Sequence, residues 1–206
     1  MKQWMNWVLI GCVAPMMSMA EIAQTADDVA PLQVGDKAPD VQLIRMDGGT
    51  IGIAEAYKEV PLVLVFFRGG WCPYCTKHLN AIGKVIPDLV ELGYQVIAIS
   101  PDSEESIREG TTKVDQGILL AQDKDFAAVE AFGLGFALDD ETLKKYESYD
   151  ISPRARESDG AHILPVPAVF VVDQQGVIQF VHYDPNYKKR LSPKDILAAA
   201  KKASEK

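Results

Sequence analysis

The feature that most constrains the fold is an unbroken apolar run that leads directly into a pair of cysteines. Residues 61–67 are Pro-Leu-Val-Leu-Val-Phe-Phe, as expected of a strand buried on both faces of a sheet. After Arg68-Gly69-Gly70-Trp71, the motif Cys72-Pro73-Tyr74-Cys75 opens a helical segment that runs to Leu92, with a bend expected at Pro87. A buried strand followed at once by a helix predicts an α/β protein.

Strands and helices are expected to alternate along the rest of the chain. The expected strands are residues 41–45, 50–53, 94–100, 118–121, 168–172 and 177–183, and the expected helices are residues 102–114, 126–132 and a last one opened by Ser192-Pro193. Their order resembles that of thioredoxin. We therefore expect an α/β, thioredoxin-like three-layer fold, with a central mixed β-sheet flanked by helices and an N-terminal β-hairpin.

Residues 134–165 are additional to that order. A helix is expected over residues 139–146, followed by a long polar stretch that ends at Pro165. Long connections of this kind are usually either functional lids or disordered segments, and the sequence leaves both alternatives open.

The first twenty residues have the composition of an export signal. Lys2 gives a positive start, residues 4–17 are mostly apolar, and Ser18-Met19-Ala20 offers small residues for cleavage after Ala20. We expect a signal peptide over residues 1–20, a linker over 21–33 and a thioredoxin-like domain over 34–206. The protein is then exported, with the periplasm as the expected compartment.

Two alternatives concern the same segment. The first is an unprocessed apolar tail or a retained anchor, although the stretch is short for a membrane-spanning helix. The second is a lipoprotein, because Leu9-Ile10-Gly11-Cys12 resembles a lipoprotein box with Cys12 as the lipidated residue. Contact with a membrane is expected only if Cys12 is lipidated. The net charge of −8 argues against a nucleic-acid partner, since phosphate contacts need clustered Lys and Arg.

Cysteine usage favours redox chemistry. The chain has three cysteines, and Cys12 lies in the expected signal, which leaves Cys72 and Cys75. A disulfide across so short a loop restrains the unfolded chain little, so a structural role is weak. The positive end of a helix dipole lowers the pKa of a thiol at Cys72, and Cys75 is spaced to attack a mixed disulfide or sulfenic acid on Cys72. Both are expected to be catalytic.

Four nearby residues are candidates for supporting roles. Arg68 could stabilise charge beside the thiols, or be a surface arginine at the end of its strand, and Trp71 is expected to pack beside the thiols. His78 is expected on the solvent side of the helix, where it could tune or shuttle a proton. Pro167 precedes a strand, a place where a cis peptide bond is a candidate. Gly69 and Gly70 are expected to allow close approach of a substrate.

A metal site is the main alternative for a C-x-x-C motif. Zinc needs four ligands, and the remaining donors, His78, His162 and His182, are scattered along the chain. We therefore expect no metal site and no cofactor.

Several stretches resemble the AhpC/TSA peroxiredoxin-like branch of the thioredoxin superfamily, over roughly residues 32–200. They are residues 34–40, 66–75, 96–101, 131–134, 164–173 and 184–187. The family pattern is Pro-x-x-x-Thr-x-x-Cys. Setting its peroxidatic cysteine on Cys75 puts Arg68 at the proline, Cys72 at the threonine and Pro167 at the family's active-site arginine. Cys72 and Pro167 match thioredoxins instead, and Cys-Pro-Tyr-Cys is the glutaredoxin sequence, so the chain resembles an Arg-Gly-Gly-Trp-Cys-Pro-Tyr-Cys branch.

The resemblance implies a thiol-dependent antioxidant oxidoreductase. In the first hypothesis a Cys72/Cys75 dithiol–disulfide cycle reduces a peroxide, and an external dithiol, such as a thioredoxin-like protein, regenerates it. In the second, an exported thiol–disulfide oxidoreductase acts on protein disulfides with Cys72 as nucleophile. A remote third hypothesis is a metal carrier that uses Cys72, Cys75 and a histidine.

Overall fold

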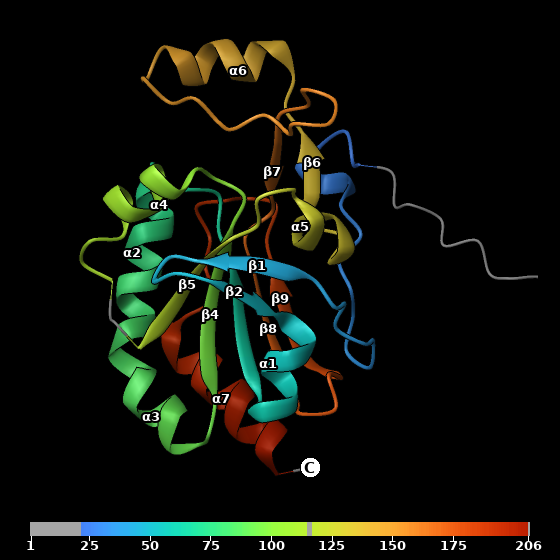
Figure 1. Ribbon diagram of the computed structural model, residues 1–206, viewed down its shortest axis with the longest axis vertical. Coiled ribbons are helices and arrows are strands. Elements are labelled where there is room, and N and C mark those ends of the chain that lie inside the picture. Colours follow the sequence, from blue (N-terminus) through green and yellow to red (C-terminus); the bar gives the residue numbers. More distant parts are fainter. Residues whose placement is uncertain (1–21, 115–116, 206) are drawn as a thin grey trace, which may run out of the picture.

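A computed structural model describes residues 22–114 and 117–205. The expected signal peptide and Cys12 lie outside the described residues. Within the described part, no helix is long and apolar enough to cross a membrane. Seven strands form one mixed sheet, in which β3, β4 and β5 are parallel and the others antiparallel to their neighbours. In sheet order they are β2 (Thr50–Gly52), β1 (Gln42–Arg45), β5 (Ile118–Gln122), β4 (Gln95–Ser100), β3 (Leu62–Phe66), β8 (Ala168–Val172) and β9 (Ile178–Tyr183) (Figure 1).

Helices cover both faces of this sheet, which gives the three expected layers. One face packs on α1 (Ile53–Glu59) and α5 (Ala127–Ala131). The other packs on four helices: α2 (Pro73–Ile82), α3 (Ile86–Glu91), α4 (Glu104–Gly110) and α7 (Pro193–Ser204). The prediction of a thioredoxin-like α/β fold with an N-terminal hairpin is therefore confirmed.

The central strand β3 shows why the sequence folds in this way. Alternate side chains point to opposite faces of a strand, so an apolar run supplies two cores at once. Leu64 and Phe66 join the core under α1 and α5, where Phe66 contacts Phe170 at a ring-centroid distance of 5.9 Å. Val63 and Val65 join the second core, against α2 and α7. Both faces of the strand are therefore buried, and the cysteine motif follows its carboxyl end.

The structure differs from the sequence prediction in three places. The helix expected over residues 72–92 is broken into α2 and α3 by a 3-10 turn, η2 (Gly83–Val85), and Pro87 lies in the first turn of α3. Helix α1 was not predicted. The additional segment contains β6 (Gly135–Ala137) and β7 (Ile163–Pro165), which pair with each other, in addition to the expected helix α6 (Asp140–Glu147).

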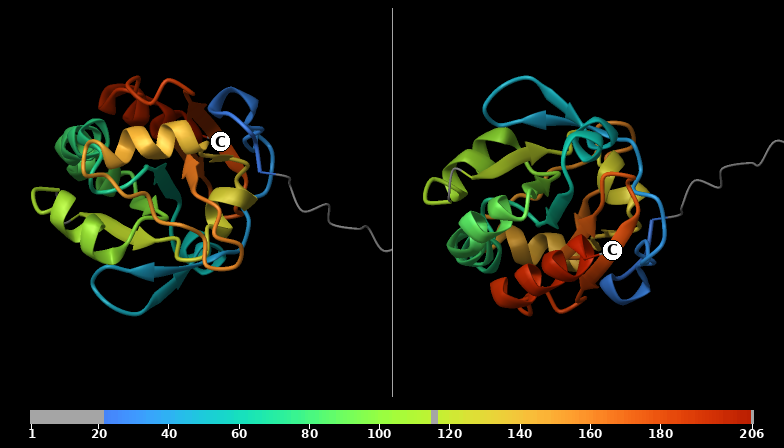
Figure 2. Two further views of the ribbon diagram at one scale, coloured as in Figure 1. Left: turned by 90° about the horizontal axis from the view of Figure 1, so that it is seen from above. Right: turned by 90° about the horizontal axis from the view of Figure 1, so that it is seen from below.

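The additional segment lies over one end of the sheet, with α6 across the top of the molecule (Figures 1 and 2). The side chain of Asp139 caps α6 by accepting a hydrogen bond from the Thr142 amide. The segment expected as a linker contributes here as well. Ala23 pairs with Phe136 of β6, and a short 3-10 turn, η1 (Ala26–Asp28), follows.

Candidate active site

Cys72 and Cys75 lie where the chain leaves β3 and enters α2. Cys72 is the N-cap residue of the helix, Pro73 occupies its first turn, and Cys75 lies one turn further along. The two cysteines are joined as a disulfide, with their Cα atoms 5.2 Å apart. Each is only 1% exposed. A reagent therefore reaches neither sulfur until part of the surrounding structure moves.

The loop before the cysteines rests on α4 through its backbone. The amide of Gly70 donates to Asp102 Oδ2 at 3.0 Å, and the Ser106 hydroxyl donates to the same oxygen at 2.5 Å. A Cβ atom at Gly70 would lie 1.7 Å from the carbonyl oxygen of Ser106, and one at Gly110 would lie 2.1 Å from that of Gly70. The close approach expected at Gly70 exists, but α4 occupies the space rather than a substrate.

Asp102 is buried behind this loop. Burial raises the pKa of its carboxyl, and hydrogen bonds from Ser106, Ser103 and Gly70 oppose that rise. Since these donors belong to the loop and to the start of α4, Asp102 positions the backbone that carries the cysteine motif.

Arg68 is 4% exposed, so the surface alternative for this residue is wrong. Its guanidinium lies over three aromatic rings, those of Trp71, Tyr146 and Tyr187, at 5.2, 5.5 and 4.3 Å from their centroids. It also donates a hydrogen bond to the Tyr146 hydroxyl of α6. Burial lowers the pKa of Arg68 to about 10, which leaves it charged at neutral pH. Arg68 thus ties α6 to the loop that carries the cysteines.

Trp71 lies where it was expected, half-buried beside the dithiol. It joins the core that contains both cysteines, and its ring lies 5.6 Å from that of Tyr146. Its indole N–H is buried without a hydrogen-bond partner in the described structure, as is Nε of Arg68.

The expectation for His78 is wrong. Its side chain is 8% exposed, and Nε2 lies 2.9 Å from the carbonyl oxygen of Leu191, so this nitrogen carries the proton and donates. Burial lowers the pKa of His78 to about 4, and the nearby charge of Arg190 acts in the same direction. His78 is therefore neutral at pH 7. Its hydrogen bond connects α2 to the chain just before α7.

Pro167 lines a small cavity with His78 and Arg190, and its peptide bond is not cis. Cis peptide bonds are absent from the described residues, so that candidate assignment is wrong. The residue before it is already engaged, since the amide of Val166 donates to the carbonyl oxygen of Leu134 at 2.9 Å. The backbone next to Pro167 is therefore paired within the chain.

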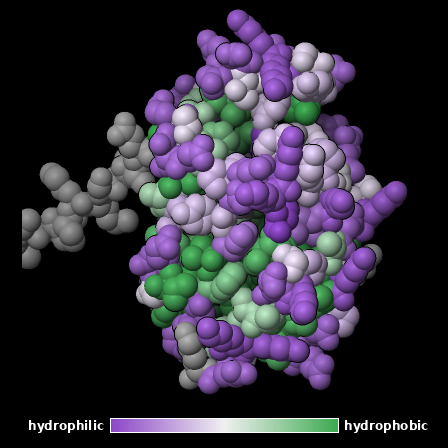
Figure 3. Space-filling model, turned by 180° about the vertical axis from the view of Figure 1, so that it is seen from behind, coloured by the Kyte–Doolittle hydropathy of each residue, from purple (hydrophilic) through white to green (hydrophobic). Residues whose placement is uncertain are grey.

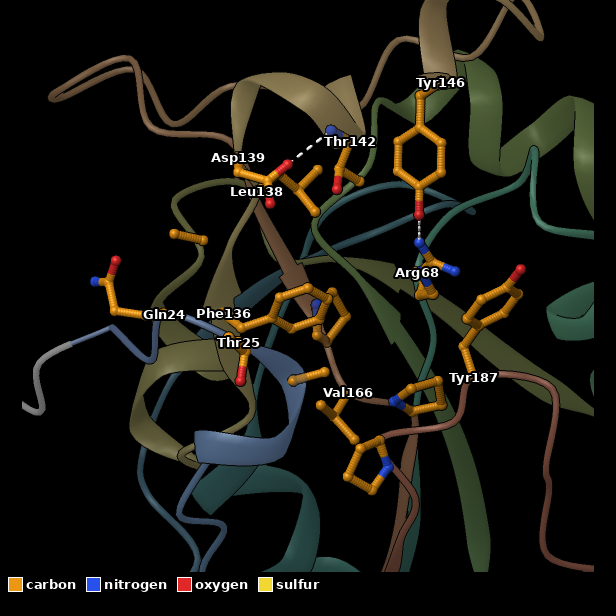
Figure 4. A pocket seen from close by; sticks show the side chains of 15 residues that line it. Gln24, Thr25, Arg68, Phe136, Leu138, Asp139, Thr142, Tyr146, Val166 and Tyr187 are labelled. Atoms are coloured by element: carbon orange, nitrogen blue, oxygen red, sulfur yellow. Dashed lines mark hydrogen bonds between the residues drawn. The ribbon is translucent and has the colours of Figure 1, made fainter. Parts of the chain in front are cut away.

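A pocket of about 270 Å³ opens beside Arg68, under α6. Its apolar wall includes Phe136, Val166 and Pro167, and Tyr146 and Tyr187 flank the guanidinium (Figure 4). Gln24, Thr25 and Ala26, from the N-terminal segment, also line the pocket, and Gln24 and Thr25 lie across it from Arg68 (Figure 4). From behind, apolar surface is visible in a hollow below the α6 segment (Figure 3). The pocket has room for a small molecule.

Sequence reasoning missed Arg190, which the fold brings to the dithiol. Its Nη2 lies 3.5 Å from Cys75 Sγ, within hydrogen-bond distance for sulfur. Burial lowers the pKa of Arg190 to about 10, against the opposing influence of Asp184. The available signal was weak: Arg190 comes three residues after the family-like stretch 184–187, but far from the cysteines in sequence.

The described residues contain no cluster of three or more His, Cys, Asp or Glu side chains that could hold a metal ion. His78 and His162 each have a ring nitrogen engaged by a backbone carbonyl, of Leu191 and Pro153 respectively. The metal-carrier hypothesis therefore finds no ligand set in this part of the chain.

Comparison with known proteins is consistent with this geometry. The sequence is 31% identical to peroxiredoxin Bcp of Bacillus subtilis over 101 residues, which span 49% of this chain and 64% of the relative. It is 28% identical to peroxiredoxin 2 of Caldanaerobacter subterraneus over 160 residues, 74% of this chain and 62% of that protein. The fold is similar to that of peroxidoxin BcpB from Mycobacterium tuberculosis, with a TM-score of 0.64 at 18% identity, covering 83% of this chain and 97% of the other.

The strongest classification comes from a family model. Residues 34–181 match the model of the AhpC/TSA family, and this range contains the hairpin, the cysteine motif, the additional segment and nearly all of the sheet. By this match, the chain belongs to the AhpC/TSA family.

Proposed function

We propose that this protein is a peroxiredoxin-type thiol peroxidase that works through a Cys72/Cys75 dithiol–disulfide cycle, in the Arg-Gly-Gly-Trp-Cys-Pro-Tyr-Cys branch of its family. Family membership and the relatives named peroxiredoxin support the reaction class. The observation that carries the proposal is the covered position of the dithiol: each cysteine is only 1% exposed, and Arg68, just before the cysteine motif, lines a pocket of about 270 Å³. This suits a small substrate.

The chemistry balances with these two thiols and one external reductant. A cysteine thiolate attacks the peroxide, so that an S–O bond forms, the O–O bond breaks, and the leaving oxygen takes a proton to become an alcohol or water. The second thiol then attacks the sulfenic sulfur, which forms the disulfide and releases water. An external dithiol reduces the disulfide by exchange and is itself oxidised. The two electrons that reduce the peroxide therefore come from that dithiol.

The alternative is a thiol–disulfide oxidoreductase that acts on exported proteins. It is favoured by Cys72 and Pro167, which match thioredoxins. An extended protein segment binds such folds most simply by adding to an open strand edge. Here β7 is paired with β6, and the amide of Val166 is held by Leu134, so this edge is already used. This pairing disfavours the alternative.

Stopped-flow fluorescence tests the proposal. Trp71 lies beside the dithiol, so oxidation of the reduced protein should change its emission. We expect hydrogen peroxide or an organic hydroperoxide, such as the alkyl peroxides reduced by the structurally similar Xanthomonas campestris protein, to oxidise the protein much faster than a free thiol. Oxidation no faster than that of free cysteine, with efficient reduction of an insulin disulfide, would establish the alternative instead.

The reductant and the compartment are parts of the same proposal. We expect a thioredoxin-like dithiol protein as reductant, measured by coupled turnover with a thioredoxin system. We also propose export with cleavage after Ala20, as the sequence of residues 1–20 indicates. Cell fractionation and the mass of the mature chain test this, and a Cys12→Ser variant that moves from the membrane to the soluble fraction would instead establish lipidation.

A further inference from the structure

Arg190 is held so that one of its nitrogens faces a reacting sulfur. It lies in the 184–191 loop, which connects β9 to α7. Its Nη1 donates to two backbone carbonyls of the same loop, that of Lys189 at 2.8 Å and that of Tyr187. Nη2 is left to approach Cys75 Sγ at 3.5 Å. The guanidinium is therefore oriented by backbone on one side and offers a donor to the sulfur on the other.

The charge of Asp184 favours the cationic form of Arg190, but Asp184 does not form an ion pair with it. Asp184 pairs with Lys189 at 3.6 Å, and no carboxylate forms an ion pair with Arg190 in the described part of the chain. The other titratable or charged groups near it are His78, His182 and Arg68, and His78 is neutral at pH 7. A disulfide is uncharged, whereas a reduced Cys75 can ionise. A thiolate at Cys75 would then be an anion within hydrogen-bond distance of this guanidinium.

The two sulfurs differ in this respect. Cys72 is the N-cap residue of α2, but its side chain accepts no capping hydrogen bond. Cys75 has a charged donor within reach. Hydrogen bonds from a cation to a charged acceptor are roughly twice as strong as neutral ones. The geometry therefore favours ionisation of Cys75. From the sequence, the helix-dipole argument favours Cys72, and the family pattern sets the peroxidatic cysteine on Cys75.

Arg190 lies near Pro167, the position that the family pattern assigns to an arginine. Both residues line one small cavity next to His78. Proline at 167 carries no charge, and the cationic residues that line this cavity are Lys189 and Arg190. Of these, Arg190 alone makes a hydrogen bond to a sulfur in the described structure.

We propose that Arg190 holds the Cys75 thiolate in the reduced protein, and that Cys75 is the sulfur that attacks the peroxide. This inference rests on the proposed function. The S–O bond then forms on Cys75, the leaving oxygen is protonated, and Cys72 attacks the sulfenic sulfur to form the disulfide and release water. During the attack Arg190 can also donate to the leaving oxygen, where negative charge develops.

Single-thiol proteins, made from a chain that starts at Glu21 and therefore lacks Cys12, give the direct test. In Cys72→Ser, thiolate formation at Cys75 is followed by absorbance at 240 nm against pH, and reactivity by stopped-flow with hydrogen peroxide. Adding Arg190→Leu should move ionisation of Cys75 roughly one to three pH units higher, and slow the peroxide reaction at pH 7 at least tenfold. Arg190→Lys should restore part of the ionisation of Cys75 and part of the rate of the peroxide reaction. Lys189→Leu, which removes an exposed neighbouring charge, is the matched control and should leave both unchanged.

Cys75→Ser isolates the other sulfur. Its Cys72 should react with peroxide more slowly than Cys75 does in Cys72→Ser, and Arg190→Leu should change it little. If Cys72 is the faster thiol, or if Arg190→Leu leaves the ionisation of Cys75 unchanged in a protein whose circular dichroism and melting temperature match the parent, the inference is wrong.

Alkylation by iodoacetamide separates this inference from the proposed function, because it reports the thiolate without any peroxide. A loss of Cys75 alkylation on Arg190→Leu, with no fast peroxide reaction in any variant, would overturn the peroxidase proposal and support the Arg190–Cys75 pairing. A fast peroxide reaction that Arg190→Leu does not slow would support the peroxidase proposal and overturn the Arg190–Cys75 pairing.

Discussion

The dithiol is covered from two sides that are built differently. On the supporting side, Gly70 packs on α4 through backbone atoms, and Asp102 bonds the loop to that helix. On the covering side, α6 and the 184–191 loop are held mainly by side chains, through Tyr146 on Arg68 and Tyr187 on Tyr74, whose rings lie 5.7 Å apart. Backbone packing that tight cannot open without unfolding the loop, whereas single side-chain contacts can. The sulfurs should therefore become accessible from the covering side.

The largest effect is expected from Gly70→Ala. The new Cβ would lie 1.7 Å from a backbone carbonyl oxygen, so α4 or the loop must shift. Overpacking of this kind costs about 3 kcal/mol, and we expect a loss of that order in the free energy of unfolding, measured in urea. Gly93→Ala is the control: its φ is +84° but nothing lies within 4 Å, so it should cost only about 1 kcal/mol. Equal losses would contradict a supporting side made rigid by backbone contact.

Asp102→Asn tests how much the Asp102 carboxyl on the supporting side contributes to stability, and how that contribution depends on pH. Because an amide replaces one acceptor oxygen, we expect a loss of about 1–3 kcal/mol in the free energy of unfolding. Burial raises the pKa of Asp102 above its ordinary 3.8, so the folded state favours the protonated carboxyl. The contribution of this protonated carboxyl to the free energy of unfolding is fully present below the pKa that Asp102 has in the unfolded state. It is lost as pH rises through the pKa that Asp102 has in the folded state.

The advantage of the wild type over Asp102→Asn should therefore shrink between pH 4 and pH 7. Urea titrations of both proteins at these two pH values measure it. An advantage that grows with pH would show that hydrogen bonds from the loop, rather than burial, dominate the carboxyl.

Tyr146→Ala tests the covering side. It removes the hydroxyl that accepts from Arg68, a bond to a charged group that contributes about 1.5 kcal/mol, or roughly tenfold in an opening equilibrium. We expect dithiothreitol to reduce the Cys72–Cys75 disulfide about tenfold faster. Tyr149→Ala, on the same segment but 64% exposed, should leave that rate unchanged. Equal rates in all three proteins would mean that the sulfurs open by another route.

The smallest effect is expected from Lys189→Leu. This residue belongs to the 184–191 loop, but its only ion pair is an exposed one with Asp184 at 3.6 Å in the described structure. Such pairs contribute little, so the free energy of unfolding should change by no more than about 0.5 kcal/mol. A larger loss would mean that the loop is held by charge rather than by Tyr187 and Arg190.

Much of the fold could be predicted from the sequence because its central strands are apolar on both faces. Residues 62–66 and 168–172 show no polar interruption, and runs of this length and composition are typical of strands buried on both faces. Strands β6 and β7 are three residues each, and a period cannot be seen over so short a length. They form because the chain brings them together, which local patterns do not reveal.

The site was only partly predictable for a related reason. The cysteines and Arg68 are adjacent in sequence, so the motif identified them together. Arg190 lies 115 residues from Cys75 and is brought to it by the order of β9 and α7. The error at His78 was avoidable, since a residue three positions after Cys75 shares its helix face, and Cys75, Leu79 and Ile82 form the buried face.

The N-terminal segment has a consequence for where the working protein begins. Gln24, Thr25 and Ala26 form one side of the pocket, and Ala23 extends the small sheet beside it. The seven-stranded sheet, the dithiol and Arg190 all lie further along the chain, so trimming to residue 30 would remove that wall without removing any of them. The proposed cleavage after Ala20 would leave this wall in place, whereas a cut beyond Ala26 would open the pocket on that side.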